Sequence, residues 1–112
     1  MELVEIIIKA LSDKKAKDIV KIDVSDKTVI ADYFIVCDAP SVTQVRALCD
    51  HVEEEVEKRG TMVLRREGVS EGRWAVLDFG EVIVHVFNSE SREFYRIERL
   101  WQDESNVEKI ED

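Results

Sequence analysis

The chain has 112 residues, of which 45% are hydrophobic, and it contains a single proline. This length corresponds to about one domain, and the composition predicts a globular protein rather than a disordered one. Twenty-five acidic and sixteen basic residues leave a formal net charge of −9. Nucleic-acid binders carry basic patches that neutralise phosphates, so this charge argues against direct RNA or DNA binding. It favours a basic protein partner, although a role in solubility alone stays an open alternative.

The sequence predicts neither a membrane span nor an export signal. No run approaches the ~20 consecutive apolar residues of a transmembrane helix. The first five residues, Met-Glu-Leu-Val-Glu, lack the basic stretch of a signal peptide. These features favour a cytoplasmic protein with no membrane partner. Cys37 lies in an apolar run and Cys49 in a helical pattern, so we expect free thiols that behave as small hydrophobic side chains.

The first half of the chain predicts the order helix, strand, strand, helix. Apolar residues recur at helical spacing over 2–13, which predicts a helix with a wide buried face. Residues 19–24 alternate in polarity, as a half-buried strand does, whereas 33–37 are apolar throughout and predict a central strand. A second helix is expected over 42–59, with Ser41 as its N-cap.

The second half predicts three short strands and a last helix. The strands are expected at about 62–66, 73–79 and 82–87, and Gly80 predicts a tight hairpin between the last two. Apolar residues at helical spacing over 94–101 predict the helix.

These elements predict a single α/β (α+β) domain with a five-stranded mixed sheet and about three helices. The domain is expected to span residues 1–102, and residues 103–112 to form a polar tail that frays. Three modest helices would leave part of one sheet face uncovered, which suits a protein-docking surface.

The sequence contains no recognisable catalytic constellation. His51 and His85 belong to no cluster with zinc-ligand spacing, and His85, among valines, is more simply a structural histidine. The four glycines form no phosphate-binding loop. Two carboxylate pairs are more simply solvated turn residues than metal ligands: Asp23 with Asp26, and Asp78 with Glu81. We therefore expect no catalytic residue, metal or cofactor.

Two segments, 71–87 (EGRWAVLDFGEVIVHVF) and 94–101 (FYRIERLW), closely resemble the signature of the RsfS/Iojap family of ribosomal silencing factors. Residues 14–20, 30–36 and Ser41-Val-Thr-Gln-Val also resemble that family, so that the match covers about residues 5–102 in order. The chain departs from the family at Phe79, where tyrosine is common, and in the turn over 37–40.

This resemblance implies a domain shaped like a nucleotidyltransferase but without the catalytic motif of those enzymes. It also implies binding to the large ribosomal subunit through its protein fourteen, at the intersubunit face. Binding there would block association with the small subunit and repress translation under nutrient limitation. A role in large-subunit assembly and a homodimer are both compatible with the family. A nucleotidyl-transferring enzyme and a self-associating acidic module are the rival hypotheses.

We place the predicted interface on the last two strands and the last helix. Alternation puts Trp74, Val76 and Asp78 on one sheet face and Ala75, Leu77 and Phe79 on the other. We expect Trp74 to be the anchor and two carboxylates to be its charge partners. The predicted partner-binding residues are Trp74, Asp78, Phe79, Glu81, His85, Tyr95 and Glu98. A purely structural role is the open alternative for each of them taken singly.

Overall fold

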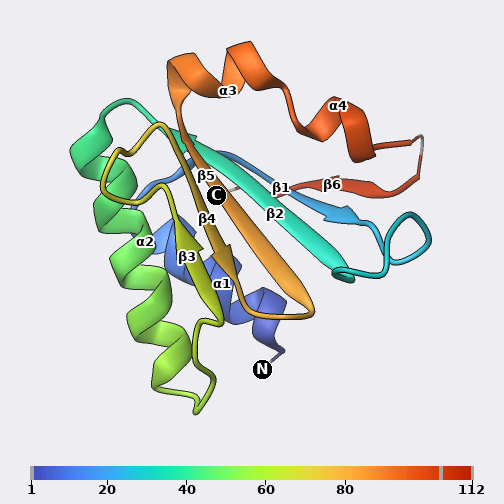
Figure 1. Ribbon diagram of the computed structural model, residues 1–112, viewed down its shortest axis with the longest axis horizontal. Helices are drawn as coiled ribbons and strands as arrows, with labels where there is room; N and C mark the ends of the chain where they lie inside the picture. The colour runs from blue at the N-terminus through green and yellow to red at the C-terminus, as the bar shows by residue number, and fades with distance from the viewer. Residues whose placement is uncertain (1, 104, 112) are drawn as a thin grey trace.

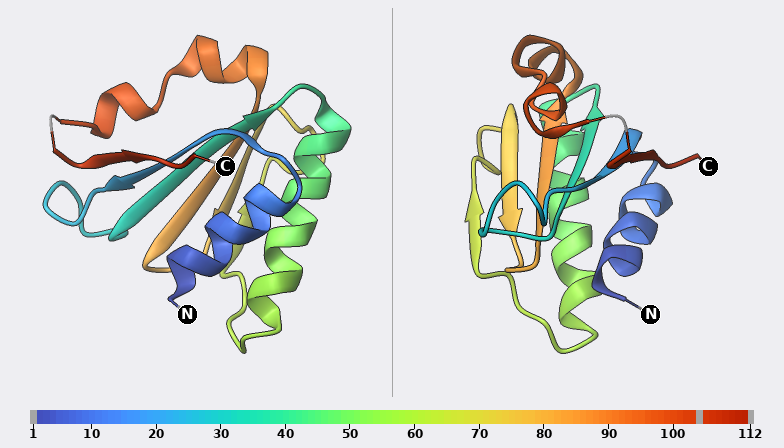
Figure 2. Two further views of the ribbon diagram at one scale, coloured as in Figure 1. Left: turned by 180° about the vertical axis from the view of Figure 1, so that it is seen from behind. Right: turned by 90° about the vertical axis from the view of Figure 1, so that its right-hand side faces the viewer.

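The computed structural model describes residues 2–103 and 105–111. It is a mixed six-stranded sheet in the order β3-β4-β5-β2-β1-β6, with α1 and α2 on one face and α3 and α4 across one end (Figure 1, Figure 2). The elements are α1 Leu3–Asp13, β1 Lys17–Asp23, β2 Tyr33–Ala39, α2 Val42–Glu57, β3 Arg65–Glu67, β4 Trp74–Asp78, β5 Val82–Asn88, α3 Ser89–Tyr95, α4 Glu98–Trp101 and β6 Val107–Lys109.

The two central strands are β2 and β5, which pair in parallel with Ile35 opposite Val84. Both are buried on both faces along most of their length, as the unbroken apolar run over 33–37 predicts. Every other strand pair is antiparallel. The predicted hairpin between β4 and β5 is confirmed, because the Phe79 backbone N–H donates to the Val82 carbonyl across a turn in which Gly80 has a φ of 91°.

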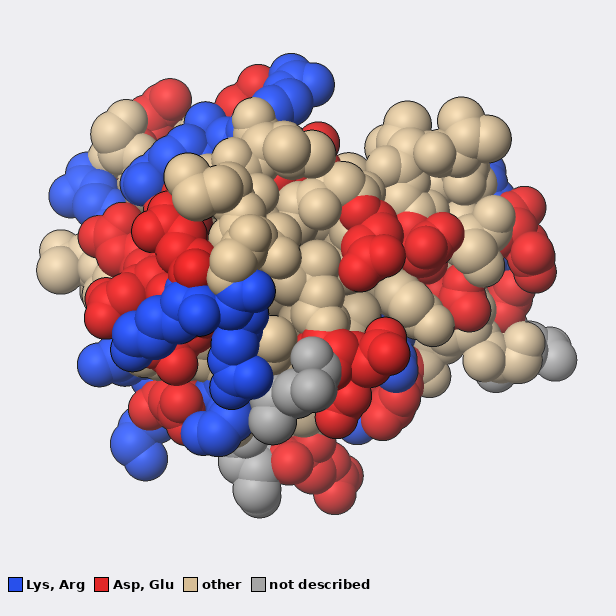
Figure 3. Space-filling model, turned by 90° about the horizontal axis from the view of Figure 1, so that it is seen from below, with Lys and Arg blue, Asp and Glu red and all other residues tan. Residues whose placement is uncertain are grey.

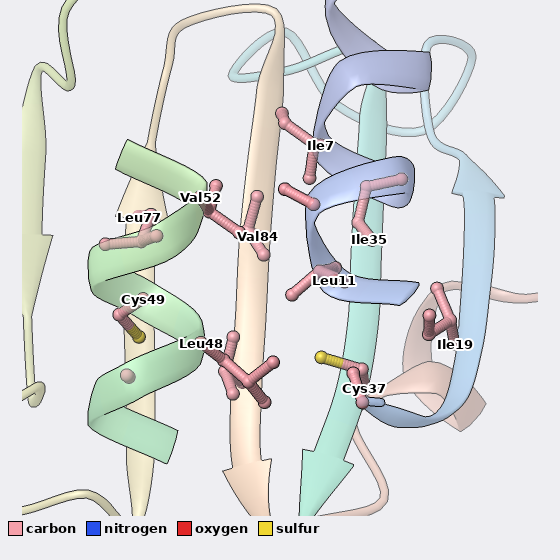
Figure 4. Close-up of a cluster of buried hydrophobic side chains, with 14 of the residues drawn as sticks. Ile7, Leu11, Ile19, Ile35, Cys37, Leu48, Cys49, Val52, Leu77 and Val84 are labelled. Atoms are coloured by element: carbon pink, nitrogen blue, oxygen red, sulfur yellow. The ribbon is translucent and has the colours of Figure 1, made fainter. Parts of the chain in front are cut away.

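The larger core lies between the sheet and helices α1 and α2. Ile7 and Leu11 from α1 meet Leu48 and Val52 from α2 above the sheet (Figure 4), and all four are fully buried. The helix α2 begins where predicted, because the Ser41 hydroxyl accepts the Gln44 backbone N–H at 3.1 Å. Packing against this layer holds β4 and β5 in position. It therefore determines which of their residues lie on the sheet face opposite the helices.

The smaller core lies on the opposite face of the sheet. Phe34, Val36 and Phe87 are buried there, and Ile97 and Trp101 pack onto them from the α3–α4 segment. Towards β4 this face loses its cover, and Trp74 and Val76 are only half-buried. The predicted partly uncovered sheet face is therefore found beside β4.

The predicted single α+β domain with a mixed sheet is confirmed, but the element counts are not. The sheet has six strands rather than five, because residues 107–109 pair with the edge strand β1 as β6. The expected frayed tail is wrong for these residues: the Asn106 side-chain amide donates to the Asp23 carbonyl at 2.9 Å and to the Trp101 carbonyl at 2.8 Å, and so holds the tail in place. The domain boundary at residue 102 stays a prediction.

The last predicted helix is two helices, which gives four in all among the described residues. Arg96 has a φ of 47°, a left-handed conformation that ends α3 before α4 begins. The strand expected at 62–66 begins only at Arg65. Within the described part of the chain, no helix combines the length and apolar character needed to cross a bilayer.

Candidate functional site

The aromatic ring of Trp74 lies at the centre of a cluster on the partly uncovered face. Trp74 is on β4 opposite Phe87 on β5, and the two rings stack with centroids 5.2 Å apart and an interplanar angle of 24°. Tyr95, the last residue of α3, packs on the indole with centroids 4.9 Å apart and lies 6.2 Å from the Phe87 ring. Aromatic pairs at such distances stabilise each other beyond the area they bury. The cluster therefore joins α3 to the sheet around Trp74.

The exposed part of this cluster is apolar. Tyr95 is 50% exposed and Phe94 beside it is 78% exposed, whereas Trp74 and Val76 are half-buried. We call these four residues the Trp74 surface. Half-buried or exposed aromatic side chains held in place by neighbours are typical of protein-binding surfaces.

Beneath the Trp74 surface, His85 is buried with an exposure of 6%. Its Nδ1 accepts the indole N–H of Trp74 at 3.1 Å, and its ring meets Phe34 edge-on at 5.0 Å. Burial in this apolar layer lowers the pKa of His85 to about 4, because the charged imidazolium loses its hydration. The histidine is therefore neutral at pH 7, and its proton is on Nε2.

Acidic side chains lie at the other end of the β4–β5 pair. Asp78 is on the same sheet face as Trp74 and accepts the Gly80 backbone N–H at 2.8 Å, and Glu81 is exposed in the turn. Figure 3 views the molecule from this end and shows acidic side chains in several places around an uncharged area. The open face therefore carries an apolar region at one end and carboxylates at the other.

A family model described as "Ribosomal silencing factor during starvation" matches residues 1–112. The chain belongs to the RsfS family. It is 36% identical over 107 residues to the ribosomal silencing factor RsfS of Halalkalibacterium halodurans, covering 96% of this chain and 92% of that protein. The resemblance found in the sequence is therefore confirmed, and ribosome association and translation regulation follow from the family.

More distant relatives and solved structures agree with this membership. The mouse protein named "Mitochondrial assembly of ribosomal large subunit protein 1" is 26% identical over 101 residues, covering 88% of this chain and 44% of that protein. A crystal structure of a protein from Chromobacterium violaceum is similar at a TM-score of 0.86 and 38% identity, covering 95% of this chain and 92% of that one. The fold described above is thus the fold of RsfS-family relatives.

The structure brings together some of the residues predicted from the RsfS signature. Trp74, His85 and Tyr95 form one contact cluster, and Asp78 and Glu81 lie farther along the same strand pair. The other two predicted residues lie elsewhere, Phe79 in the core under α1 and α2, and Glu98 against Arg92. With an exposure of 6%, Phe79 is poorly placed to touch a partner.

A buried ionic network that the sequence does not reveal holds α3 and α4 on the sheet. The Arg92 guanidinium lies 2.8 Å from the Asp38 carboxylate and 3.1 Å from that of Glu98, and it donates to the Asp18 carbonyl at 2.6 Å. The Ser89 hydroxyl donates to Asp38 at 2.6 Å. Arg92 stands in a charged run that is typical of a solvated helix face, so only its partners, distant in sequence, identify its role.

The described residues offer little for metal or thiol chemistry. Across 2–103 and 105–111, no group of three or more His, Cys, Asp or Glu side chains is placed to hold a metal ion. Cys37 and Cys49 are free and buried, and burial raises the pKa of both thiols, that of Cys49 to about 12. A groove of about 730 Å³ between β1, β6 and α3–α4 is lined by charges of both signs, including Lys17, Arg99 and Glu111.

Proposed function

We propose that this chain binds the large ribosomal subunit in the cytoplasm through protein fourteen of that subunit. Occupying the intersubunit face there prevents the small subunit from joining and so represses translation when nutrients are scarce. The protein acts by steric blocking, without catalysis. Membership of the RsfS family supports the proposal. The structural observation that supports a particular interface is the Trp74 surface.

The Trp74 surface has the chemistry of a binding hot spot. Tryptophan and tyrosine are enriched among residues whose truncation weakens protein complexes most. Trp74 packs against both Phe87 and Tyr95, so little side-chain freedom is lost when a partner covers it. An anchor that is already ordered before binding gives affinity at low entropic cost.

The charge of the chain suits a basic ribosomal protein. The net charge is −9, and Asp78 and Glu81 lie at the turn end of the strand pair that carries Trp74. Acidic residues at the far end of the strand pair that carries an apolar anchor favour a partner with basic residues at the matching end. We expect these two carboxylates to contribute to encounter and orientation, and Trp74 to contribute most of the binding energy.

The mouse relative's name supports a second candidate function, assistance in assembly of the large subunit. The same docking surface would serve both functions, because each requires recognition of the large subunit. A homodimer that covered the Trp74 surface would compete with this docking. The two functions can be distinguished in cells, since a loss of assembly lowers the number of large subunits whereas a loss of silencing does not.

The test is sucrose-gradient sedimentation of purified subunits with and without the protein. We expect the protein to migrate with the large subunit and the fraction of joined ribosomes to fall. Trp74→Ala should weaken binding by about 2 kcal/mol, or roughly 30-fold. Met62→Ala is the matched control, because it removes an apolar side chain that is 64% exposed in the α2–β3 connection. Equal binding of the two variants would refute the interface, and a protein that stayed at the top of the gradient would refute the function.

A further inference from the structure

The polar edge of the Trp74 indole points into the protein. Its N–H donates to Nδ1 of His85 at 3.1 Å, and His85 is buried on the neighbouring strand β5. The two residues are diagonal neighbours across the β4–β5 pair, because Trp74 is opposite Phe87 and Val76 is opposite His85. This diagonal reach lets long side chains on one sheet face interact. The hydrogen bond therefore adds a directional contact that fixes the rotation of the indole, whereas Phe87 and Tyr95 contact it through ring packing.

The other nitrogen of His85 indicates that histidine occupies this position for its hydrogen-bond acceptor and not for packing. Because Nδ1 accepts a hydrogen bond, Nε2 must carry the proton. Nε2 is buried and has no hydrogen-bond partner among the described residues, and the Phe34 ring meets the imidazole edge-on at 5.0 Å. A buried donor without a partner is unfavourable, and a valine like its neighbours Val84 and Val86 would avoid it. What histidine adds at this position is the acceptor that faces Trp74.

We propose that His85 is the positioning residue of the Trp74 surface: it accepts the indole N–H and so holds the ring in the orientation that docks, with its polar edge turned away from the partner. The proposal rests on the proposed function. It implies that the partner recognises Trp74 through an apolar cleft and shape alone, since the indole N–H is already bonded inside the protein. Without the acceptor, the N–H would seek water or the partner, and the ring would turn.

The experiment compares three variants by two measurements on the full chain. His85→Leu removes the acceptor and keeps an apolar side chain, whereas His85→Asn places an amide oxygen where Nδ1 stands. Trp74→Phe removes the donor. The first measurement is the NMR signal of the indole N–H of Trp74, assigned by its loss in Trp74→Phe, together with its exchange rate with water. The second is affinity for purified large subunits.

We expect the indole N–H of the wild-type protein and of His85→Asn to exchange slowly, and that of His85→Leu to exchange at least about tenfold faster. His85→Leu should bind large subunits roughly tenfold more weakly than wild type, and His85→Asn should bind within about threefold of it. In a Trp74→Phe background the same His85→Leu change should alter affinity by less than about twofold, because the bond it removes is already absent. Circular dichroism and thermal unfolding confirm that each variant is folded.

Two results would overturn the positioning role while leaving the proposed function intact. In one, His85→Leu frees the indole N–H but binds as tightly as wild type, although Trp74→Ala binds weakly. In the other, His85→Leu weakens binding equally with Trp74 or Phe at position 74, which indicates a packing role. If Trp74→Ala itself binds normally, both the interface and the positioning role are wrong.

Discussion

At the scale of single residues, His85 couples the stability of the fold to pH. Its pKa falls from 6.5 to about 4 on burial, so the unfolded chain binds a proton at a pH where the folded chain does not. The contribution of neutral His85 is complete above pH 6.5 and is lost as the pH falls towards 4. The full shift corresponds to on the order of 3 kcal/mol of unfolding free energy.

We therefore expect the wild type to lose stability relative to His85→Asn as the pH falls from 7 to 4.5, by roughly 2 kcal/mol or more. Urea unfolding at several pH values measures this difference. In the comparison between the two proteins, the contribution of their shared carboxylates to the pH dependence cancels. If the two unfolding free energies fell in parallel, His85 would not be the titrating group. Low pH should also release the indole N–H of Trp74, because imidazolium offers no acceptor.

Residue-level predictions from the sequence succeeded where strand parity decides them. Alternation placed Trp74 and Val76 on the face opposite Ala75 and Leu77, and their burial confirms it. The same parity places Phe79 on the helix side, which argues against its inclusion in the partner-binding set. Parity gives no information on contacts between a strand and a helix, so the packing of Tyr95 in α3 on Trp74 needed the structure.

At the scale of elements, the α3–α4 segment is positioned by one buried arginine. The side chains of Arg92 and Asp38 are 11% and 7% exposed, and Arg92 also bonds Glu98 and a carbonyl of β1. Because α3 carries Phe94 and Tyr95, this network also sets where half of the Trp74 surface lies. Breaking a buried ion pair by removing one partner is strongly destabilising, since the other charge stays desolvated.

Arg92→Met should lower the unfolding free energy by about 3 kcal/mol, measured by urea unfolding. Arg99→Met, on the exposed side of α4, is the matched control and should change it by less than about 0.5 kcal/mol. The double variant Arg92→Met with Asp38→Leu should recover part of the loss, because Asp38, the more deeply buried of the two carboxylate partners of Arg92, is then no longer left without its cation. A small effect of Arg92→Met alone would show that water satisfies Asp38.

The elements that the sequence failed to predict are those set by distant contacts. Phe94, Ile97 and Trp101 have helical spacing, but the left-handed Arg96 breaks the helix so that Ile97 and Trp101 reach the smaller core while Phe94 stays outside. Residues 107–109 are too few and too polar to predict a strand, and they form one because β1 offers an open edge. In both cases a long-range interaction outweighs local preference.

At the scale of the whole molecule, the α+β class follows from the order and periodicity of the elements, but the strand order does not. The β4–β5 hairpin is local and was predicted, whereas the parallel pairing of β2 with β5 joins segments more than forty residues apart. The layer of α1 and α2 covers one face and leaves the other partly open beside β4. This asymmetry makes one face of the sheet available for docking.

The net charge of −9 leads to a prediction about rates. If acidic residues steer the protein towards a basic partner, the association rate with large subunits should fall on the order of tenfold between about 50 mM and 500 mM salt, with a much smaller change in dissociation. Trp74→Ala should instead speed dissociation and leave the salt dependence unchanged, whereas Asp78→Asn with Glu81→Gln should flatten it. Stopped-flow binding with labelled protein measures both rates. An association rate that did not depend on salt would assign the acidic surface to solubility alone, and docking would then rest on the apolar Trp74 surface.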